Sequence, residues 1–216
     1  MKRGIIETSI RAGDNLRTVR CEFATPREVG ALAKWKVARP GNAGMVDAVE
    51  YAGLTCKRWG FYLEEGRAVT DAHQLRNPAI ANADELAFLV VARAPWAEPS
   101  TLGLCLFRRS WCNHLIVDFL AVHPTFQEGG EQPVKGIGAA LLLSVTEIAT
   151  LLGAKQIWGE ATRGSAQKYE RFFLLENVRD LFVVNREAYT DFGKRLLIRS
   201  PETRLLLRQK SPISPP

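Results

Sequence analysis

The sequence of 216 residues lacks any long uninterrupted apolar run. A membrane-spanning helix needs roughly 20 consecutive apolar residues. The short apolar stretch after the N-terminal Met1-Lys2-Arg3-Gly4 ends at Glu7. Hydrophobic residues make up 46% of the chain, an ordinary share for a globular protein with a sizeable core. We therefore expect a soluble, cytoplasmic protein with no membrane partner.

Cysteine and histidine are scarce, and their spacing argues against the common metal sites. The four cysteines are widely separated and form no Cys-x-x-Cys pair: Cys21, Cys56, Cys105 and Cys112. The three histidines show no helical ligand spacing: His73, His114 and His123. Zinc sites usually combine closely spaced cysteines and histidines. We therefore expect no bound metal and four reduced thiols.

The net charge of +6 is concentrated at the C-terminal end of the chain. Residues 194–216 contain Glu202 and six basic residues: Lys194, Arg195, Arg199, Arg204, Arg208 and Lys210. Such a segment can contact nucleic acid, an acidic partner or the phosphates of a coenzyme. It lacks the interleaved aromatic residues on which bases stack, so a nucleic-acid partner is not expected.

The order of the predicted elements indicates an α+β fold. Strands are expected at residues 18–23, 86–93, 101–108, 115–122, 156–160, 181–184 and 195–198. Helices are expected from the capping-box sequence Thr25-Pro26-Arg27-Glu28 onward and at residues 43–63, 138–152 and 165–173. The three strands between residues 86 and 122 read as an antiparallel meander. The strand, helix, strand order that follows implies a parallel crossover.

The ends of the chain and one long connection are expected to be irregular. Residues 1–16 show no clear period and are expected to form a loose N-terminal arm before a domain at 17–200. Residues 64–84 are polar and rich in turn formers, which predicts a surface loop. A turn is expected at 191–193. The basic, proline-rich tail at 201–216 is expected to hold a short helix around 205–207 and a disordered end.

One segment indicates a phosphate-binding site. The strand ending in Leu120-Ala121-Val122-His123-Pro124 is followed by Lys135-Gly136-Ile137-Gly138 at the start of a leucine-rich helix. A helix start presents free backbone N–H groups and the positive end of the helix dipole, which together accommodate phosphate oxygens. The two glycines allow a close approach of the backbone. The same pattern is also compatible with a simple tight turn.

This stretch resembles the GNAT superfamily of acyl-CoA-dependent N-acyltransferases, whose motif joins a Leu-Ala-Val-x-Pro strand end to a Gly-x-Gly helix start. A second motif, a strand and then a helix with a central tyrosine, is similar to residues 156–173. The resemblance implies a mixed, mainly antiparallel sheet that is splayed at the coenzyme site and flanked by helices. It implies acetyl-CoA as co-substrate, with contacts from Leu120, Ala121, Val122, Lys135, Gly136, Ile137, Gly138, Ala139 and Ser165.

The resemblance also implies catalytic roles. Tyr169 would protonate the departing thiolate, because a phenol can donate to a developing thiolate. Its alternative role is that of a core tyrosine with its hydroxyl at the edge. Asp118, in an apolar strand, and Glu160, at the end of the next strand, are the candidate general bases. Either carboxylate could instead be structural, as a hydrogen-bond acceptor or a strand-end charge.

Three departures from the family pattern stand out. Pro133 occupies the position of the usual Gln or Arg before the first glycine, residues 127–132 look like an insertion, and the Gly-Phe after the tyrosine helix is absent. The predicted function is transfer of an acetyl group from acetyl-CoA to a primary amine on a small molecule or a protein, with a homodimer left open. The alternatives are a catalytically silent CoA-binding or regulatory module and a nucleic-acid-associated protein.

Overall fold

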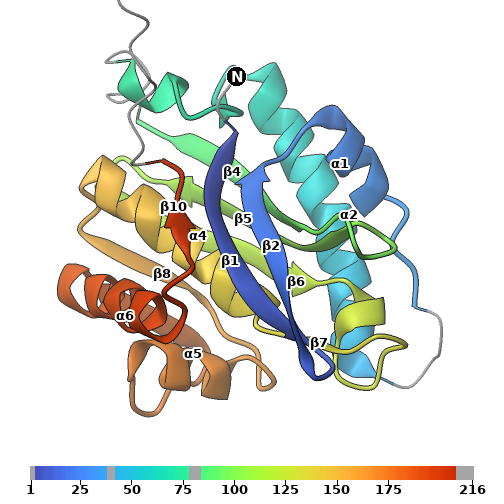
Figure 1. The fold of residues 1–216 in the computed structure, drawn as a ribbon. Helices are drawn as coiled ribbons and strands as arrows, with labels where there is room; N and C mark the ends of the chain where they lie inside the picture. Colours follow the sequence, from blue (N-terminus) through green and yellow to red (C-terminus); the bar gives the residue numbers. More distant parts are fainter. Residues whose placement is uncertain (1–2, 38–41, 78–83, 208–216) are drawn as a thin grey trace, which may run out of the picture.

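The computed structural model describes residues 3–37, 42–77 and 84–207 (Figure 1). The strands are β1 Gly4–Ala12, β2 Asn15–Phe23, β3 Ala68–Val69, β4 Leu86–Arg93, β5 Thr101–Arg109, β6 His114–Val122, β7 Val134–Lys135, β8 Gln156–Glu160, β9 Leu181–Asn185 and β10 Arg204–Leu205. The α-helices are α1 Pro26–Leu32, α2 Ala43–Glu64, α4 Ile137–Leu152, α5 Ala166–Phe173 and α6 Arg186–Arg199. Two short 3-10 helices are η1 Gln74–Arg76 and η2 Pro124–Phe126.

The strands form one curled sheet in the order β10-β1-β2-β4-β5-β6-β8-β9. Neighbours along this path are antiparallel except β6 and β8, which are parallel because α4 provides the crossover between them. Of the two short strands outside this path, β3 pairs with β4 and β7 pairs with β1. The expected fold class is confirmed: α+β, with a mixed, mainly antiparallel sheet flanked by helices.

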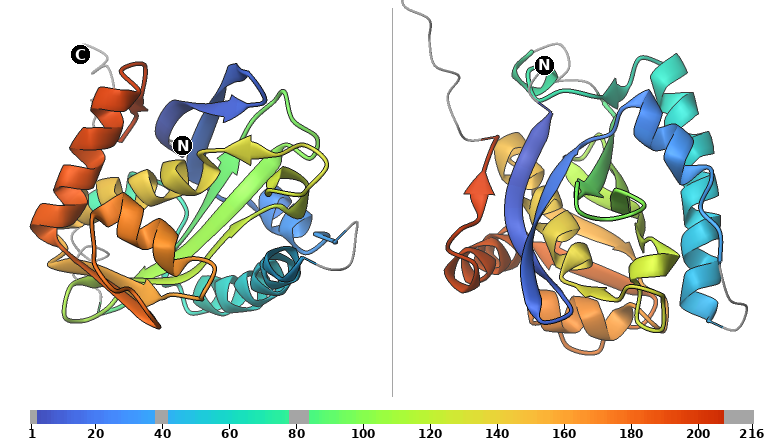
Figure 2. Two further views of the ribbon diagram at one scale, coloured as in Figure 1. Left: turned by 90° about the horizontal axis from the view of Figure 1, so that it is seen from below. Right: turned by 45° about the vertical axis from the view of Figure 1, so that its right-hand side comes forward.

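Helices cover both faces of the sheet, and each face has its own apolar core. Figure 2 shows α1 and α2 on one side, with α4, α5 and α6 on the other. The larger core lies under α4, whose residues from Ala140 to Ala149 are all buried. The smaller core lies under α1 and α2 and includes Trp59. A helix that is apolar on nearly all sides belongs in the middle of the molecule, and α4 occupies that place.

Local sequence signals fix the ends of the two helices that were predicted most sharply. At α1 the capping box is formed, since the Glu28 N–H donates to the Thr25 hydroxyl oxygen and the Glu28 carboxylate accepts from the Thr25 N–H. At the end of α4, Gly153 adopts the left-handed conformation with φ of 62°, which glycine accommodates without strain. Both boundaries agree with the predicted ones to within one residue.

The N-terminal segment is not the loose arm that was expected, because residues 4–12 form β1. This strand pairs with β2 and β10, and its end pairs with β7. Ile5, Ile6 and Ile10 are buried in the larger core. An irregularity in register between Gly4 and Ile6 places two consecutive isoleucines in the interior. The strict alternation that would have indicated a strand is therefore missing from the sequence.

The C-terminal predictions were also wrong in part. Residues 186–199, expected to include a turn and a strand, form α6, which is capped by Asn185 through a 2.9 Å bond from the Ala188 N–H. Its buried residues Tyr189, Phe192 and Gly193 follow the helical spacing that the local turn signals obscured. The short helix expected at 205–207 is replaced by β10, because the chain returns to pair with β1. The end of the tail, 208–216, lies outside the described residues.

The predicted loop at 64–84 contains β3 and η1 in its described part, and residues 78–83 lie outside it. In the described ranges all four cysteines are free thiols, and no group of three or more metal-binding side chains comes together. None of the described helices combines the length and the apolar character needed to cross a membrane.

Candidate active site

The parallel strands β6 and β8 separate near the middle of β6, at the end of β8. Their ladder runs from His114 opposite Gln156 to Val117 opposite Gly159, and β6 continues for five more residues without a partner on that side in the described part of the chain. Gly159 stands at the point of separation, where a Cβ would lie 2.6 Å from the Val117 carbonyl oxygen. The sheet is therefore splayed between β6 and β8, as the family resemblance implied for the coenzyme site, and this gap between the two strands is hereafter called the splay.

A β-bulge marks the β6 side of the splay. In the ladder with β5, Leu106 faces Phe119 while Phe107 faces Val117, so Asp118 is the extra residue. A bulge puts two consecutive side chains on one face of a strand. Asp118 and Phe119 accordingly both face α2, where Arg58 lies 5.4 Å from the centre of the Phe119 ring.

The Asp118 carboxylate is held by two guanidinium groups. Arg58 lies 2.9 Å away and Arg108 3.2 Å away, and the Asp118 side chain is only 7% exposed. Burial raises the pKa of Asp118, and the two arginines oppose that shift. A carboxylate with two cationic partners is well placed to connect α2 to the bulge. Its lone pairs are already engaged by donors.

The start of α4 has the features expected of a phosphate site. Gly136 is the N-cap, with φ of 104°, and no side chain caps the helix in this part of the structure. A Cβ at Gly138 would meet nothing closer than Leu120 Cδ2 at 4.0 Å, so there is room for a side-chain atom at this position. Lys135 is exposed on β7, directly opposite Arg11 of β1. The uncapped N–H groups and two cations together favour an anion.

The predicted coenzyme-contact residues of β6 face different ways. Leu120 and Val122 point to the α4 side, whereas Ala121 is buried in the core under α2. The Val122 carbonyl accepts a 2.8 Å bond from the Gln127 amide. The same amide donates to the Gly44 carbonyl at 3.3 Å, so the 127–132 segment joins the end of β6 to the start of α2.

Two further predicted contacts lie at helix starts. Ala139 is half-buried in the first turn of α4, next to Gly138. Ser165 is the N-cap of α5, and its hydroxyl accepts from the Thr162 N–H at 2.9 Å. The Ser165 hydroxyl is thus used locally to close the turn that leads from β8 into α5.

Tyr169 is a buried tyrosine on α5 with its ring stacked on Phe182. The ring centres are 3.9 Å apart, and 5% of the residue is exposed. Burial is the main cause of a strongly raised pKa of the Tyr169 phenol, and the neighbouring Cys105 and Tyr51 add to it. The hydroxyl therefore stays protonated over the whole physiological range and can act as a donor.

Tyr51 is a residue of this site that sequence reasoning missed. It lies on α2, half-buried, with its ring centre 5.4 Å from that of Phe119. Burial raises its pKa, with smaller contributions from carboxylates that include Glu160. Glu160 is exposed at the end of β8, beyond the last β6 ladder pair. Tyr51 thus lies against the part of β6 that borders the splay, and nothing in its spacing along α2 marked it.

The structure therefore brings most of the predicted residues to one region. Glu160 and the end of β6 border the splay, and the start of α4 lies beside Leu120 of β6. Tyr169 stacks on Phe182, whose ring lies close to Gly159. Asp118 lies at the bulge on the α2 side. Arg58 and Arg108, which hold Asp118, were not predicted because their pairing depends on the bulge. The chemical roles of the predicted residues remain predictions.

No protein-family model matches the chain, and neither does any curated protein sequence. Several solved structures similar to it are acetyltransferases of the GNAT family. One from Staphylococcus aureus Mu50 has a TM-score of 0.47 and 10% identity, covering 78% of this chain and 99% of that one. The PaiA N-acetyltransferase of Thermoplasma acidophilum, in complex with coenzyme A, has a TM-score of 0.46 and 13% identity, covering 77% and 98%. Nourseothricin acetyltransferase has a TM-score of 0.36 and 19% identity, and the chain covers 65% of its length. Likeness at this level decides neither the activity nor the acceptor.

Proposed function

We propose that the protein transfers an acetyl group from acetyl-CoA to a primary amine. The observation that carries this proposal is the splay, which opens beside the uncapped start of α4. The half of β6 that has no partner on the β8 side includes Leu120, whose Cδ2 would lie 4.0 Å from a Cβ at Gly138. A strand with free backbone groups and a helix start with free N–H groups suit the two ends of an acyl-CoA.

The residues at the start of α4 fit the coenzyme. The N–H groups at Ile137, Gly138 and Ala139 would hold the pyrophosphate, with Lys135 beside them. Acetyl-CoA, when bound, supplies an acetyl group activated as a thioester. The backbone of Leu120 to Val122 would orient the thioester carbonyl along β6. The acyl carbon would then lie within the splay, between Tyr169 on one face of the sheet and Tyr51 on the other.

Transfer forms a C–N bond and breaks a C–S bond, so one proton leaves the amine and one reaches the sulfur. We assign the first proton to Glu160, which is exposed beside the splay, rather than to Asp118, which is engaged by Arg58 and Arg108. We assign the second to the Tyr169 hydroxyl, which burial keeps protonated. A general base contributes about 3 to 5 kcal/mol and orientation of two reactants about 7 to 11 kcal/mol. Positioning in the splay is therefore the larger effect.

A catalytically silent module that binds CoA is the second candidate, and one observation favours it. The Asp118 carboxylate is held in ion pairs, which leaves the solvent-exposed Glu160 as the remaining carboxylate proposed for the base. Turnover of the thioester in the presence of an amine separates an enzyme from such a module.

The first prediction concerns coenzyme binding. At a hundredfold excess over its Kd, acetyl-CoA should add about 2.7 kcal/mol to the free energy of unfolding and raise the melting temperature by roughly 5 to 11 °C. S-acetylpantetheine, which has the thioester but no pyrophosphate, is the matched control and should give a much smaller shift. No shift with millimolar acetyl-CoA would remove the coenzyme from the proposal.

The loss of thioester absorbance then tests catalysis against a panel of amines. Polyamines, aminoglycosides, amino acids and peptides with free N-termini cover the main chemical classes. Binding without turnover on any of them would favour the silent module. Turnover on one class would establish the enzyme and identify its acceptor.

A further inference from the structure

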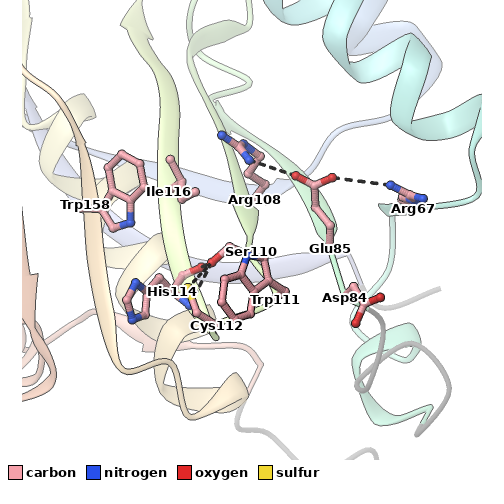
Figure 3. A pocket seen from close by; sticks show the side chains of 10 residues that line it. All are labelled: Arg67, Asp84, Glu85, Arg108, Ser110, Trp111, Cys112, His114, Ile116 and Trp158. Atoms are coloured by element: carbon pink, nitrogen blue, oxygen red, sulfur yellow. Dashed lines mark hydrogen bonds and ion pairs between the residues drawn. The ribbon is translucent and has the colours of Figure 1, made fainter.

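A cavity of about 490 Å³ opens on the α2 side of the sheet, beyond the C-terminal end of α2 (Figure 3). Its walls come from the start of β6, the facing part of β8, the end of β5 and the residues just before β4. The volume falls within the range of roughly 300 to 1,000 Å³ that is usual for pockets that bind small molecules. None of the predicted site residues lines it.

One wall of the cavity is a row of ion pairs. Glu85 lies 3.0 Å from Arg108 and 3.7 Å from Arg67, and Figure 3 shows the three side chains in line. Glu85 also accepts from the Tyr62 hydroxyl at 3.2 Å. Together with Asp84, the wall presents two arginines and two carboxylates. Because these charges balance, the wall does not favour a polycation.

The remaining lining is aromatic and apolar. Trp158 is half-buried and Ile116 is 7% exposed, whereas Trp111 is 84% exposed at the edge of the cavity. A tryptophan this exposed contributes little to folding, because most of its surface stays in water. A flat apolar ligand would cover the two indole rings and remove that surface from solvent. Aromatic rings stack favourably in this way.

The cavity lies next to the splay along the β6–β8 ladder. Ile116 and Trp158 are partners in the ladder, and the next pair, Val117 and Gly159, is the last before the strands part. Trp158 and Glu160 lie on the same face of β8, two residues apart, which corresponds to roughly 7 Å. On the β6 side, Arg108 lines the cavity and binds Asp118 at the bulge. A ligand in the cavity can therefore reach the splay with a short substituent.

We infer that this cavity binds the body of the acceptor amine, and that the body is an aromatic ring on a short alkyl chain. The inference rests on the proposed function. The two tryptophans provide the stacking surface, and the balanced charges disfavour polyamines and aminoglycosides. A chain of two or three carbon atoms bridges the distance from Trp158 to Glu160. An arylalkylamine thus reaches the splay with its nitrogen while its ring stays in the cavity.

Calorimetric titration with 2-phenylethylamine tests the inference directly, first on the protein alone and then with CoA present. Trp111→Ala and Trp158→Ala should each weaken binding about 5- to 10-fold, because each removes one stacking surface. Trp158→Phe keeps an aromatic ring and should restore most of the affinity. Ile198→Ala is the matched control, since Ile198 is 79% exposed on α6, away from the cavity, and should leave binding unchanged.

The outcomes separate the cavity from the proposed function. If the protein does not bind acetyl-CoA, the proposed function is overturned. Binding of 2-phenylethylamine to the coenzyme-free protein tests the cavity independently of that result. The inference about the cavity is overturned if millimolar 2-phenylethylamine does not bind, or if Trp111→Ala binds it as well as the unchanged protein does. Tighter binding of spermidine than of 2-phenylethylamine would overturn the aromatic class.

Discussion

At the scale of single residues, environment distinguishes the candidate catalytic groups from one another. Tyr169 is a neutral phenol in an apolar setting, stacked on Phe182, and burial raises its pKa. Asp118 is held by two arginines, and Glu160 is exposed beside the splay. Asp118 and Glu160, which the sequence left open as alternative bases, thus have different surroundings in the fold. The phenol suits a proton donor, and the exposed carboxylate suits an acceptor.

Replacing Tyr169 by Phe tests the donor role. The substitution removes the hydroxyl and keeps the ring stacked on Phe182, so the melting temperature and the affinity for acetyl-CoA should change little. The kcat of acetyl transfer should fall between roughly 10- and 10⁴-fold, because a proton donor to the leaving sulfur is lost. Steady-state kinetics with the best amine of the panel provide the measurement.

Tyr189→Phe is the matched control for this substitution. Tyr189 is fully buried, and its hydroxyl donates to the Ala154 carbonyl at 2.8 Å, outside the splay. Its loss should lower stability by about 0.5 to 1.5 kcal/mol and leave kcat unchanged. An unchanged kcat in the Tyr169 variant as well would make Tyr169 a core residue without a catalytic role.

At the scale of elements, the site depends on where the β6–β8 ladder ends and where α4 begins. The β6–β8 ladder stops at Gly159, and α4 starts at a left-handed Gly136 that a short ladder between β7 and β1 holds in place. A Cβ at Gly136 would lie 3.2 Å from Ile10 of β1, which shows how closely the N-terminal strand approaches this turn. The turn is therefore packed closely against β1.

Gly138→Val tests whether the start of α4 holds the pyrophosphate. The structure leaves open space at this position, so the valine should be accommodated, and its effect on helix propensity is below about 1 kcal/mol. The side chain would occupy the approach of the phosphates and abolish acetyl-CoA binding. Calorimetry for affinity and thermal unfolding for stability, on the same variant, separate the two effects.

Gly53→Val is the corresponding control on α2, where a Cβ also meets no atom within 4 Å. It should change neither coenzyme affinity nor stability by much. If Gly138→Val is stable and still binds acetyl-CoA normally, the phosphates do not lie at this turn. A large fall in its melting temperature without ligand would instead indicate a packing role for Gly138.

At the scale of the whole molecule, β1 joins parts of the chain that are far apart in sequence. It pairs with β2, with β7 before α4, and with β10 near the C-terminal end. Its buried isoleucines belong to the same core as α4 and α6. The stability of the site should therefore depend on β1, although the sequence analysis predicted that this segment is a loose arm outside the domain.

Ile6→Ala tests this integration. Ile6 is fully buried, and truncation of such a side chain costs about 2 to 5 kcal/mol, which corresponds to a fall of roughly 4 to 20 °C in melting temperature. Leu16→Ala, at a residue 67% exposed near the β1–β2 turn, should stay within about 0.5 kcal/mol of the unchanged protein. Equal melting temperatures for the two variants would mean that β1 adds nothing to the fold.

The sequence by itself determined the elements whose signals are local. The capping box at Thr25, the apolar helix that stops at Gly153 and the three meander strands all formed as predicted, because caps, periods and breakers act within a few residues. The succession of these elements was also sufficient for the α+β class and the parallel crossover, whereas the splay was expected from the family resemblance. The Gly-x-Gly helix start could be placed for the same reason.

Only the tertiary structure decided what depends on distant partners. Residues 4–12 become a strand by pairing with β2, β7 and β10, and residues 204–205 by pairing with β1, and no local pattern shows this. Residues 191–198 form part of a helix because Tyr189 and Phe192 pack beneath it, which overrides the turn signal at 191–193. Asp118 acquires its arginine partners through a bulge, and Tyr51 reaches the splay from α2. These placements come from pairing and burial between residues far apart in the chain, which a single sequence does not encode locally.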